Sequence, residues 1–110
     1  MTKCVVVTTT LPGEAEAGRI AEAAVGERLA ACAQVQGPLK STFHWRGGVD
    51  HADEWYCHLK TTRKRLPALE ALIRALHPYA VPEIIAIDIV AGHAPYLSWI
   101  EQTVRGEKKE

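Results

Sequence analysis

The first apolar run of the chain covers residues 3–10, "KCVVVTTT", and consists mostly of β-branched residues. It is followed by Leu11-Pro12-Gly13, a sequence typical of a turn. Because the run does not alternate apolar and polar residues, it predicts a strand that is buried on both faces. Residues 14–31 then place apolar side chains at helical spacing, which predicts an amphipathic helix. The members of this apolar face are Ala17, Ile20, Ala21, Ala24, Val25 and Leu29.

The middle of the chain predicts a long antiparallel hairpin. Residues 32–48 and 49–62 form its two strands, joined by a turn at Gly47-Gly48. Proline cannot donate a ladder hydrogen bond, so Gly37-Pro38 predicts a bulge or bend in the first strand. Side chains on the second strand alternate between two faces. Trp55, Cys57 and Leu59 share one face, and Glu54, Tyr56, His58 and Lys60 share the other.

Three further elements follow the hairpin. An apolar stripe predicts a helix from residue 66 to residue 76, ended by Pro78. The run "EIIAIDIV", residues 83–90, predicts a fourth strand, and residues 94–105 predict a short third helix. Residues 106–110, "GEKKE", are predicted to form a flexible, solvated tail. The chain of 110 residues is expected to fold as a single domain, 1–110.

The order β-α-β-β-α-β, with an additional C-terminal helix, predicts an α+β fold. It matches the ferredoxin-like split βαβ pattern, in which two helices cover one face of a four-stranded antiparallel sheet. A third helix can cover only part of the other face. The hairpin is also long for a monomer of this size, and its edges offer exposed pairing surfaces. We therefore expect an oligomer.

Composition excludes several classes of partner. Thirteen basic and thirteen acidic residues give a formal net charge of +0, which does not favour binding to nucleic acid or to an anionic membrane surface. The longest basic cluster, Arg63 to Arg65, is too short for a surface that tracks phosphates. No apolar run approaches the roughly 20 residues of a membrane helix. Three cysteines without a CxxC motif favour reduced thiols, and the N-terminus does not resemble a signal peptide, so a cytoplasmic location is expected.

The motifs of catalysis and of structural metal centres are missing from the sequence. The histidines and cysteines lack the paired spacing of a structural zinc site, although a weak copper site remains open because imidazole binds Cu(II) readily. The cysteines are more simply explained as core residues. No nucleophile motif or phosphate-binding loop is present, so we expect no catalytic residues and no enzymatic activity. An enzyme that uses Cys57 as its nucleophile is the least favoured alternative.

Polar residues at the ends of the predicted elements form a better candidate site. Trp45, Lys60, Tyr79 and Glu83 could line a cleft, within one chain or between subunits, that binds a small anion or a partner. The competing interpretation is a network of ion pairs and hydrogen bonds that sets the register of an oligomer. Both interpretations remain open from the residues alone.

Five segments in order resemble the CutA family of divalent-cation tolerance proteins. They are "ERLAACAQV" (27–35), "FHWRGGVDHADEW" (43–55), "LKTTRKR" (59–65), "LHPYAVPEIIAIDI" (76–89) and "YLSWIE" (96–101). The resemblance runs from about Val5 to about Glu101, nearly the whole chain. Any one segment is weak evidence, whereas five with compatible spacing are highly specific.

The resemblance implies a ferredoxin-like subunit in a homotrimer, a cytoplasmic setting, and weak binding of copper or another divalent cation as part of the response to metal ions. It also leaves a second hypothesis, because the trimer resembles the PII signalling proteins in architecture. On that hypothesis the chain is a small-ligand signalling or scaffold protein with the site between subunits.

Site residues follow from the resemblance position by position. The W-x-G, K-T and H-P-Y-x-x-P-E motifs of the family correspond to Trp45 with Gly47, to Lys60 with Thr61, and to the stretch from His77 to Glu83. The copper ligands proposed for some members include a first-strand cysteine and paired histidines, where this chain has Thr9, Leu76 and His77. The resemblance thus leaves His77 as the metal-ligand candidate, together with Cys4, which is on the same strand as Thr9.

Overall fold

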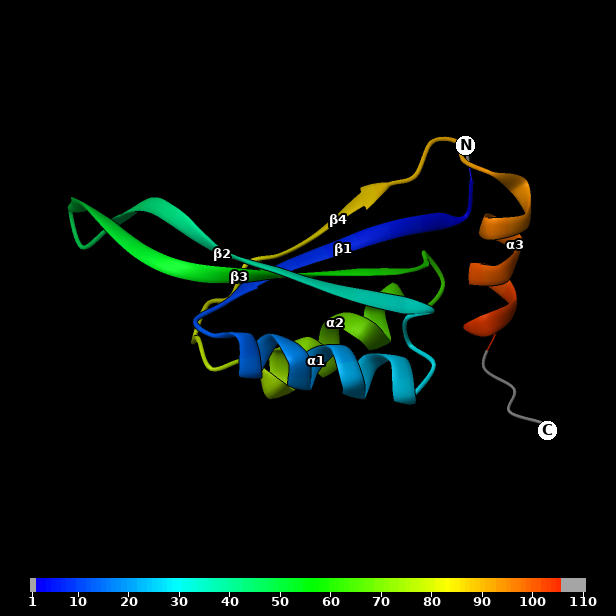
Figure 1. The fold of residues 1–110 in the computed structure, drawn as a ribbon, viewed down its shortest axis with the longest axis horizontal. Coiled ribbons are helices and arrows are strands. Elements are labelled where there is room, and N and C mark those ends of the chain that lie inside the picture. The colour runs from blue at the N-terminus through cyan, green and yellow to red at the C-terminus, as the bar shows by residue number, and fades with distance from the viewer. Residues whose placement is uncertain (1, 106–110) are drawn as a thin grey trace.

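The computed structural model describes residues 2–105, which form four strands and three helices (Figure 1). In chain order the elements are β1 (Cys4–Leu11), α1 (Glu14–Gly26), β2 (Cys32–Trp45), β3 (Gly48–Thr62), α2 (Leu66–Leu76), β4 (Ile84–Asp88) and α3 (Ala94–Thr103). The predicted α+β class and element order are confirmed. The tail predicted over residues 106–110 lies outside the described residues.

The four strands form one antiparallel sheet in the order β2-β3-β1-β4. Helices α1 and α2 lie side by side on one face of the sheet, and α3 stands at one end of it (Figure 1). The main core fills the space between the sheet and these two helices, and includes Val7, Leu59 and Ile73. A smaller cluster joins Cys4 to Ile100 and Val104 of α3. The third helix therefore covers only one end of the sheet, as expected.

Strand β1 is the central element of the sheet. It pairs with β3 on one side and with β4 on the other, so that Val7 faces Leu59 and Ala86. Seven of its eight residues are buried, which confirms the prediction from its non-alternating sequence. Because two neighbours use its backbone groups, β1 fixes the relative positions of the elements that contact its two ends.

The prediction that the first helix extends to residue 31 is wrong, because α1 ends at Gly26. Arg28 adopts the left-handed conformation with φ 59°. Its N–H donates to the carbonyl of Val25 at 3.0 Å, and the N–H of Leu29 donates to Ala24 at 2.9 Å. This pair of bonds is the Schellman ending of a helix. Apolar residues continue at helical spacing through Leu29, so periodicity alone does not show where the helix ends. Glycine usually occupies the left-handed position after a helix, but here it is Arg28.

The hairpin of β2 and β3 extends well beyond the rest of the sheet (Figure 1). Its register shifts between Gln36 and Leu39, which confirms the predicted irregularity at Gly37-Pro38. The turn lies one residue earlier than predicted, at Arg46-Gly47, because Trp45 pairs with Gly48. Both turn residues have positive φ, 51° and 80°, as a two-residue turn that continues the strand twist requires.

The three helices in residues 2–105 are 13, 11 and 10 residues long. None of them is long and apolar enough to cross a membrane.

The bulge provides a stability test. A Cβ added at Gly37 would lie 2.6 Å from Cδ2 of Trp55, closer than side chains pack. We predict that Gly37→Ala lowers the free energy of unfolding by about 1–3 kcal/mol, because the indole must move. The measurement is urea unfolding monitored by tryptophan fluorescence.

Gly18→Ala is the matched control, since no atom lies within 4 Å of the added Cβ and Gly18 is inside α1. It should raise stability by about 1 kcal/mol through helix propensity. Equal stability of Gly37→Ala and the unsubstituted protein would show that the bulge tolerates a side chain.

Candidate functional site

His77 lies at the C-terminal end of α2, where the following Pro78 disfavours further helix. Its side chain is turned back onto the end of β1 and is 9% exposed. Nε2 lies 2.9 Å from the carbonyl oxygen of Thr10 and 3.1 Å from the hydroxyl of Thr9. Nδ1 accepts the backbone N–H of Tyr79 at 3.2 Å. This arrangement selects the neutral tautomer, in which Nε2 carries the proton and donates it to Thr10.

Tyr79 connects the segment between α2 and β4 to β3. Its hydroxyl donates to Oε2 of Glu54 at 2.7 Å, and the Glu54 residue is 8% exposed. Burial, followed by the hydrogen bond to the Glu54 carboxylate and its charge, raises the pKa of Tyr79 to about 12. The rings of His77 and Tyr79 lie 5.0 Å apart between centroids. Together these contacts hold the link between α2 and β4 against the ends of β1 and β3.

These donors do not form a ready-made metal site within one chain. Both ring nitrogens of His77 already have hydrogen-bond partners, so a metal ion would have to displace one of them. Over residues 2–105, no group of three His, Cys, Asp or Glu side chains is placed to hold a metal ion. Thr9 occupies the position where the resemblance predicts a cysteine, and its hydroxyl contacts His77 directly. A neutral hydroxyl is a far weaker copper ligand than a thiolate.

Cys4 lies at the opposite end of β1 from His77. It is five positions from Thr9 in the sequence, which corresponds to roughly 17 Å along a strand. Its side chain is fully buried, and Sγ lies 3.8 Å from the carbonyl oxygen of Leu97. Burial, with a smaller contribution from Glu101, raises the pKa of the thiol. The structure therefore does not bring the two predicted metal ligands together within one chain.

The four residues of the predicted cleft are also dispersed within one chain. Trp45 is 58% exposed at the hairpin tip and has the guanidinium of Arg46 5.5 Å from its ring centroid. Lys60, near the other end of β3, donates to the side-chain oxygen of Gln34. Tyr79 is engaged with Glu54, and Glu83 is exposed just before β4. A shared cleft between subunits remains a prediction.

Two features were not predicted from the sequence. One is the role of Glu54 as the buried partner of Tyr79, which requires residues 25 positions apart to meet. The other is a pocket of about 650 Å³ lined by Lys3, Thr62, Arg63, Lys64, Arg65, Glu101, Val104 and Arg105. The cluster Arg63 to Arg65 is visible in the sequence, but Lys3 and Arg105 join it only in the fold.

The hydrogen bond between Tyr79 and Glu54 can be tested by removing one atom. We predict that Tyr79→Phe lowers the free energy of unfolding by about 1–3 kcal/mol, because the Glu54 carboxylate stays buried without its donor. Urea unfolding provides the measurement. Tyr56→Phe is the control, since the structure gives the Tyr56 hydroxyl no hydrogen-bond partner among residues 2–105. Equal losses in the two variants would contradict a specific role for the bond.

Stability should depend on pH through His77. Burial lowers the pKa of His77 from 6.5, more than the Thr10 carbonyl and Glu54 raise it. Below about pH 6.5 the unfolded chain therefore binds a proton before the folded chain does. The stabilising contribution is present above pH 6.5 and is lost as the pH falls toward the lowered value.

We predict that His77→Gln reduces the slope of unfolding free energy against pH, as the pH falls below about 6.5, by at most about 1.4 kcal/mol per pH unit. The slope comes from urea titrations at several pH values. The pKa of His58 is lowered in the same direction by burial and then Lys60, so part of the slope should persist. His51→Gln, which replaces an exposed histidine, is the control, and His77→Gln should reduce the slope more than this control does. An unchanged slope in His77→Gln would contradict the assignment.

Comparison with known proteins identifies the family. Residues 5–103 match the family described as "CutA1 divalent ion tolerance protein". The chain is 43% identical over 97 residues to the divalent-cation tolerance protein CutA of Thermus thermophilus, covering 88% of this chain and 94% of that protein. It is 39% identical over 93 residues to mouse Protein CutA, covering 84% of this chain and 52% of the mouse protein.

The fold agrees with the sequence comparison. A solved structure described as the periplasmic divalent cation tolerance protein CutA from Archaeoglobus fulgidus superposes with a TM-score of 0.88 at 35% identity. The superposition covers 92% of this chain and 98% of that one. Family match, identity and fold coincide over nearly the same residues, and the chain therefore belongs to the CutA1 family of divalent ion tolerance proteins.

Proposed function

We propose that this protein takes part in the response to divalent metal ions, and that it binds copper or another divalent ion weakly as a homotrimer. The observation that carries the proposal is the family match over residues 5–103. The relatives from Thermus thermophilus and Archaeoglobus fulgidus are named divalent-cation tolerance proteins, which supports a relationship to metal ions for this chain as well.

The surface of the subunit supports self-association. Ile85 and Ile87 of β4 pair with Thr8 and Val6, which alternate along β1 with the core residues Val5 and Val7. They therefore lie on the sheet face opposite the main core, where they are 48% and 57% exposed. Large exposed apolar side chains on an edge strand favour pairing with another subunit. The hairpin tip adds Phe43, Trp45 and Val49, which are also exposed. Three copies would bury both regions and remove the open edges of β2 and β4.

We further assign the subunit to the ferredoxin-like class. Support comes from the element order β-α-β-β-α-β and from the sheet order β2-β3-β1-β4, in which β1 and β3 are central. Both crossover helices, α1 and α2, lie on the same face of the sheet, as the split βαβ arrangement requires (Figure 1).

The metal site that we propose is built around His77 and is weak for a physical reason. A metal ion must replace one of the hydrogen bonds at its ring nitrogens. Thr9 supplies a hydroxyl at 3.1 Å from Nε2, where a thiolate would bind copper more strongly. Further ligands would have to come from another subunit, since His77 and Cys4 occupy opposite ends of β1.

The same proposal includes a non-enzymatic role in the cytoplasm. Burial raises the pKa of Cys57 to about 11, which opposes formation of a nucleophilic thiolate. All three cysteines are free thiols, as expected in a reducing compartment. Within one chain Trp45, Lys60, Tyr79 and Glu83 do not converge, so the small-ligand signalling hypothesis gains no specific support.

Calorimetric titration of metal-free protein with Cu(II) tests the proposal. Sedimentation should first give the mass of a trimer. We predict saturable, weak binding that His77→Ala reduces by about tenfold with the trimer intact. Thr9→Cys should increase the affinity, because it places a thiol beside His77.

A gain of affinity in Thr9→Cys cannot result from loss of fold stability, and it therefore separates ligation from unfolding. His51→Ala, at an exposed histidine, is the control for adventitious imidazole binding and should change little. Equal heats in the unsubstituted protein and in His77→Ala would remove His77 from the metal site.

A further inference from the structure

The pocket of about 650 Å³ lies where three segments meet. Lys3 precedes β1, and Thr62 ends β3. Arg63 to Arg65 form the turn before α2. Glu101 lies in α3, and Val104 and Arg105 follow it. None of the residues discussed for metal binding lines it. Its volume falls within the range of small-molecule sites, roughly 300–1,000 Å³.

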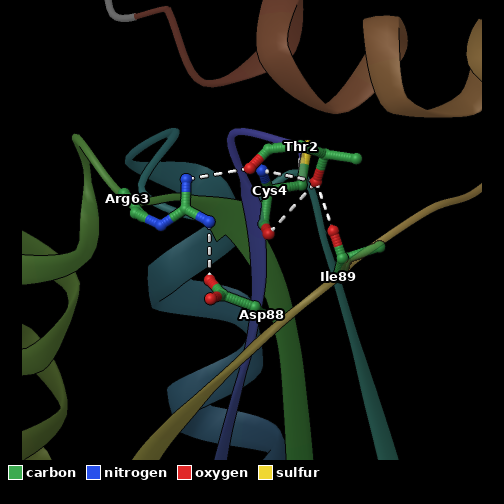
Figure 2. A network of polar contacts seen from close by, with 5 residues as sticks. All are labelled: Thr2, Cys4, Arg63, Asp88 and Ile89. Carbon is green, nitrogen blue, oxygen red and sulfur yellow. Dashed lines mark hydrogen bonds and ion pairs between the residues drawn. The ribbon is translucent and has the colours of Figure 1, made fainter.

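Two arginines in the wall are held in place by hydrogen bonds. The guanidinium of Arg63 donates to the carbonyl oxygen of Thr2 at 2.8 Å and to Oδ1 of Asp88 at 2.7 Å (Figure 2). Thr2 is fixed in turn, since its hydroxyl donates to Ile89 and accepts the backbone N–H of Cys4. On the other side, Nε of Arg65 donates to the carbonyl oxygen of Val104 at 2.6 Å. The wall is therefore organised before any ligand arrives.

The pocket is strongly positive although the chain as a whole is neutral. Five basic side chains line it, against the single carboxylate of Glu101. Among these five, Arg63 alone forms an ion pair within residues 2–105, with Asp88. The two ion pairs found within residues 2–105 leave Lys3, Lys64 and Arg105 without a carboxylate partner there. Several like charges gathered in a concave region focus the local potential and attract anions.

The lining determines the class of anion. Guanidinium and ammonium groups are suited to phosphate oxygens, arginine through two parallel hydrogen bonds and lysine as a point charge. No aromatic side chain lines the pocket, so there is no platform on which a nucleobase could stack. Recognition would rest on the phosphates alone. A nucleic acid strand is disfavoured because the basic residues form one compact pocket and the net charge of the chain is +0.

We propose that this pocket is a binding site for a small metabolite that carries two or more phosphate groups, recognised through those phosphates by Lys3, Lys64, Arg65 and Arg105. Glu101 opposes binding by its charge and limits the affinity. The site is separate from the His77 region, which lies at the other end of β1.

Calorimetric titration with inorganic pyrophosphate tests the site on the full-length protein in metal-free buffer. Saturable binding that weakens with added salt is expected. The double variant Lys64→Gln/Arg105→Gln should weaken it by about tenfold or more, since it removes two charged contacts. Glu101→Gln should tighten binding by about threefold, because it removes the opposing charge.

The matched control is Arg19→Gln/Arg74→Gln, which makes the same change in net charge at exposed positions of α1 and α2. It should leave the affinity unchanged. Equal weakening of pyrophosphate binding in the two double variants would show that the loss follows from the net charge of the protein, and would overturn the site. No saturable binding of pyrophosphate would overturn it as well. So would binding of an oligonucleotide, but not of pyrophosphate, that depends on Lys64 and Arg105.

Discussion

The antiparallel pairing of β1 with both β3 and β4 is the constraint on which the rest of the structure depends. The strand is buried along almost its whole length, and different side chains contact its two ends. At its C-terminal end, Thr9 and Thr10 hold the imidazole of His77. At its N-terminal end, Thr2 holds Arg63 and thereby one wall of the basic pocket. A shift in the register of β1 would therefore disturb both regions together.

Thr9 occupies the position where the resemblance to the family predicts a cysteine, and no group of three potential metal ligands is found within residues 2–105. The hydroxyl of Thr9 lies 3.1 Å from Nε2 of His77. Nε2 of the histidine bonds to β1, and its Nδ1 accepts the backbone N–H of Tyr79, so that the side chain holds the two segments together. If a metal ion binds at His77 as proposed, it must displace one of these hydrogen bonds. Their strength would then limit the affinity for metal.

Elements with strong local signals could be predicted from the sequence, and tertiary features could not. The β-branched run of β1 and the apolar stripe of α2 determine their own secondary structure, and both were located correctly. The end of α1 was missed because Arg28, rather than a glycine, adopts the left-handed conformation there. The partnership of Tyr79 with Glu54 and the pocket around Arg65 depend on segments brought together by the sheet. Spacing along the chain carries no signal for such contacts.

A net charge of +0 disfavours nucleic acid and anionic membrane surfaces as partners only at the level of the whole surface. Acidic residues spread over the rest of the chain balance the total, whereas screening limits their influence to about 10 Å at moderate salt. A ligand inside the pocket responds to the charges that line it, and these are five basic groups and one carboxylate. Arg63 and Arg65 are already fixed by backbone carbonyls, so ordering them on binding costs little entropy. Local charge and rigidity, rather than total charge, therefore decide whether this fold binds an anion.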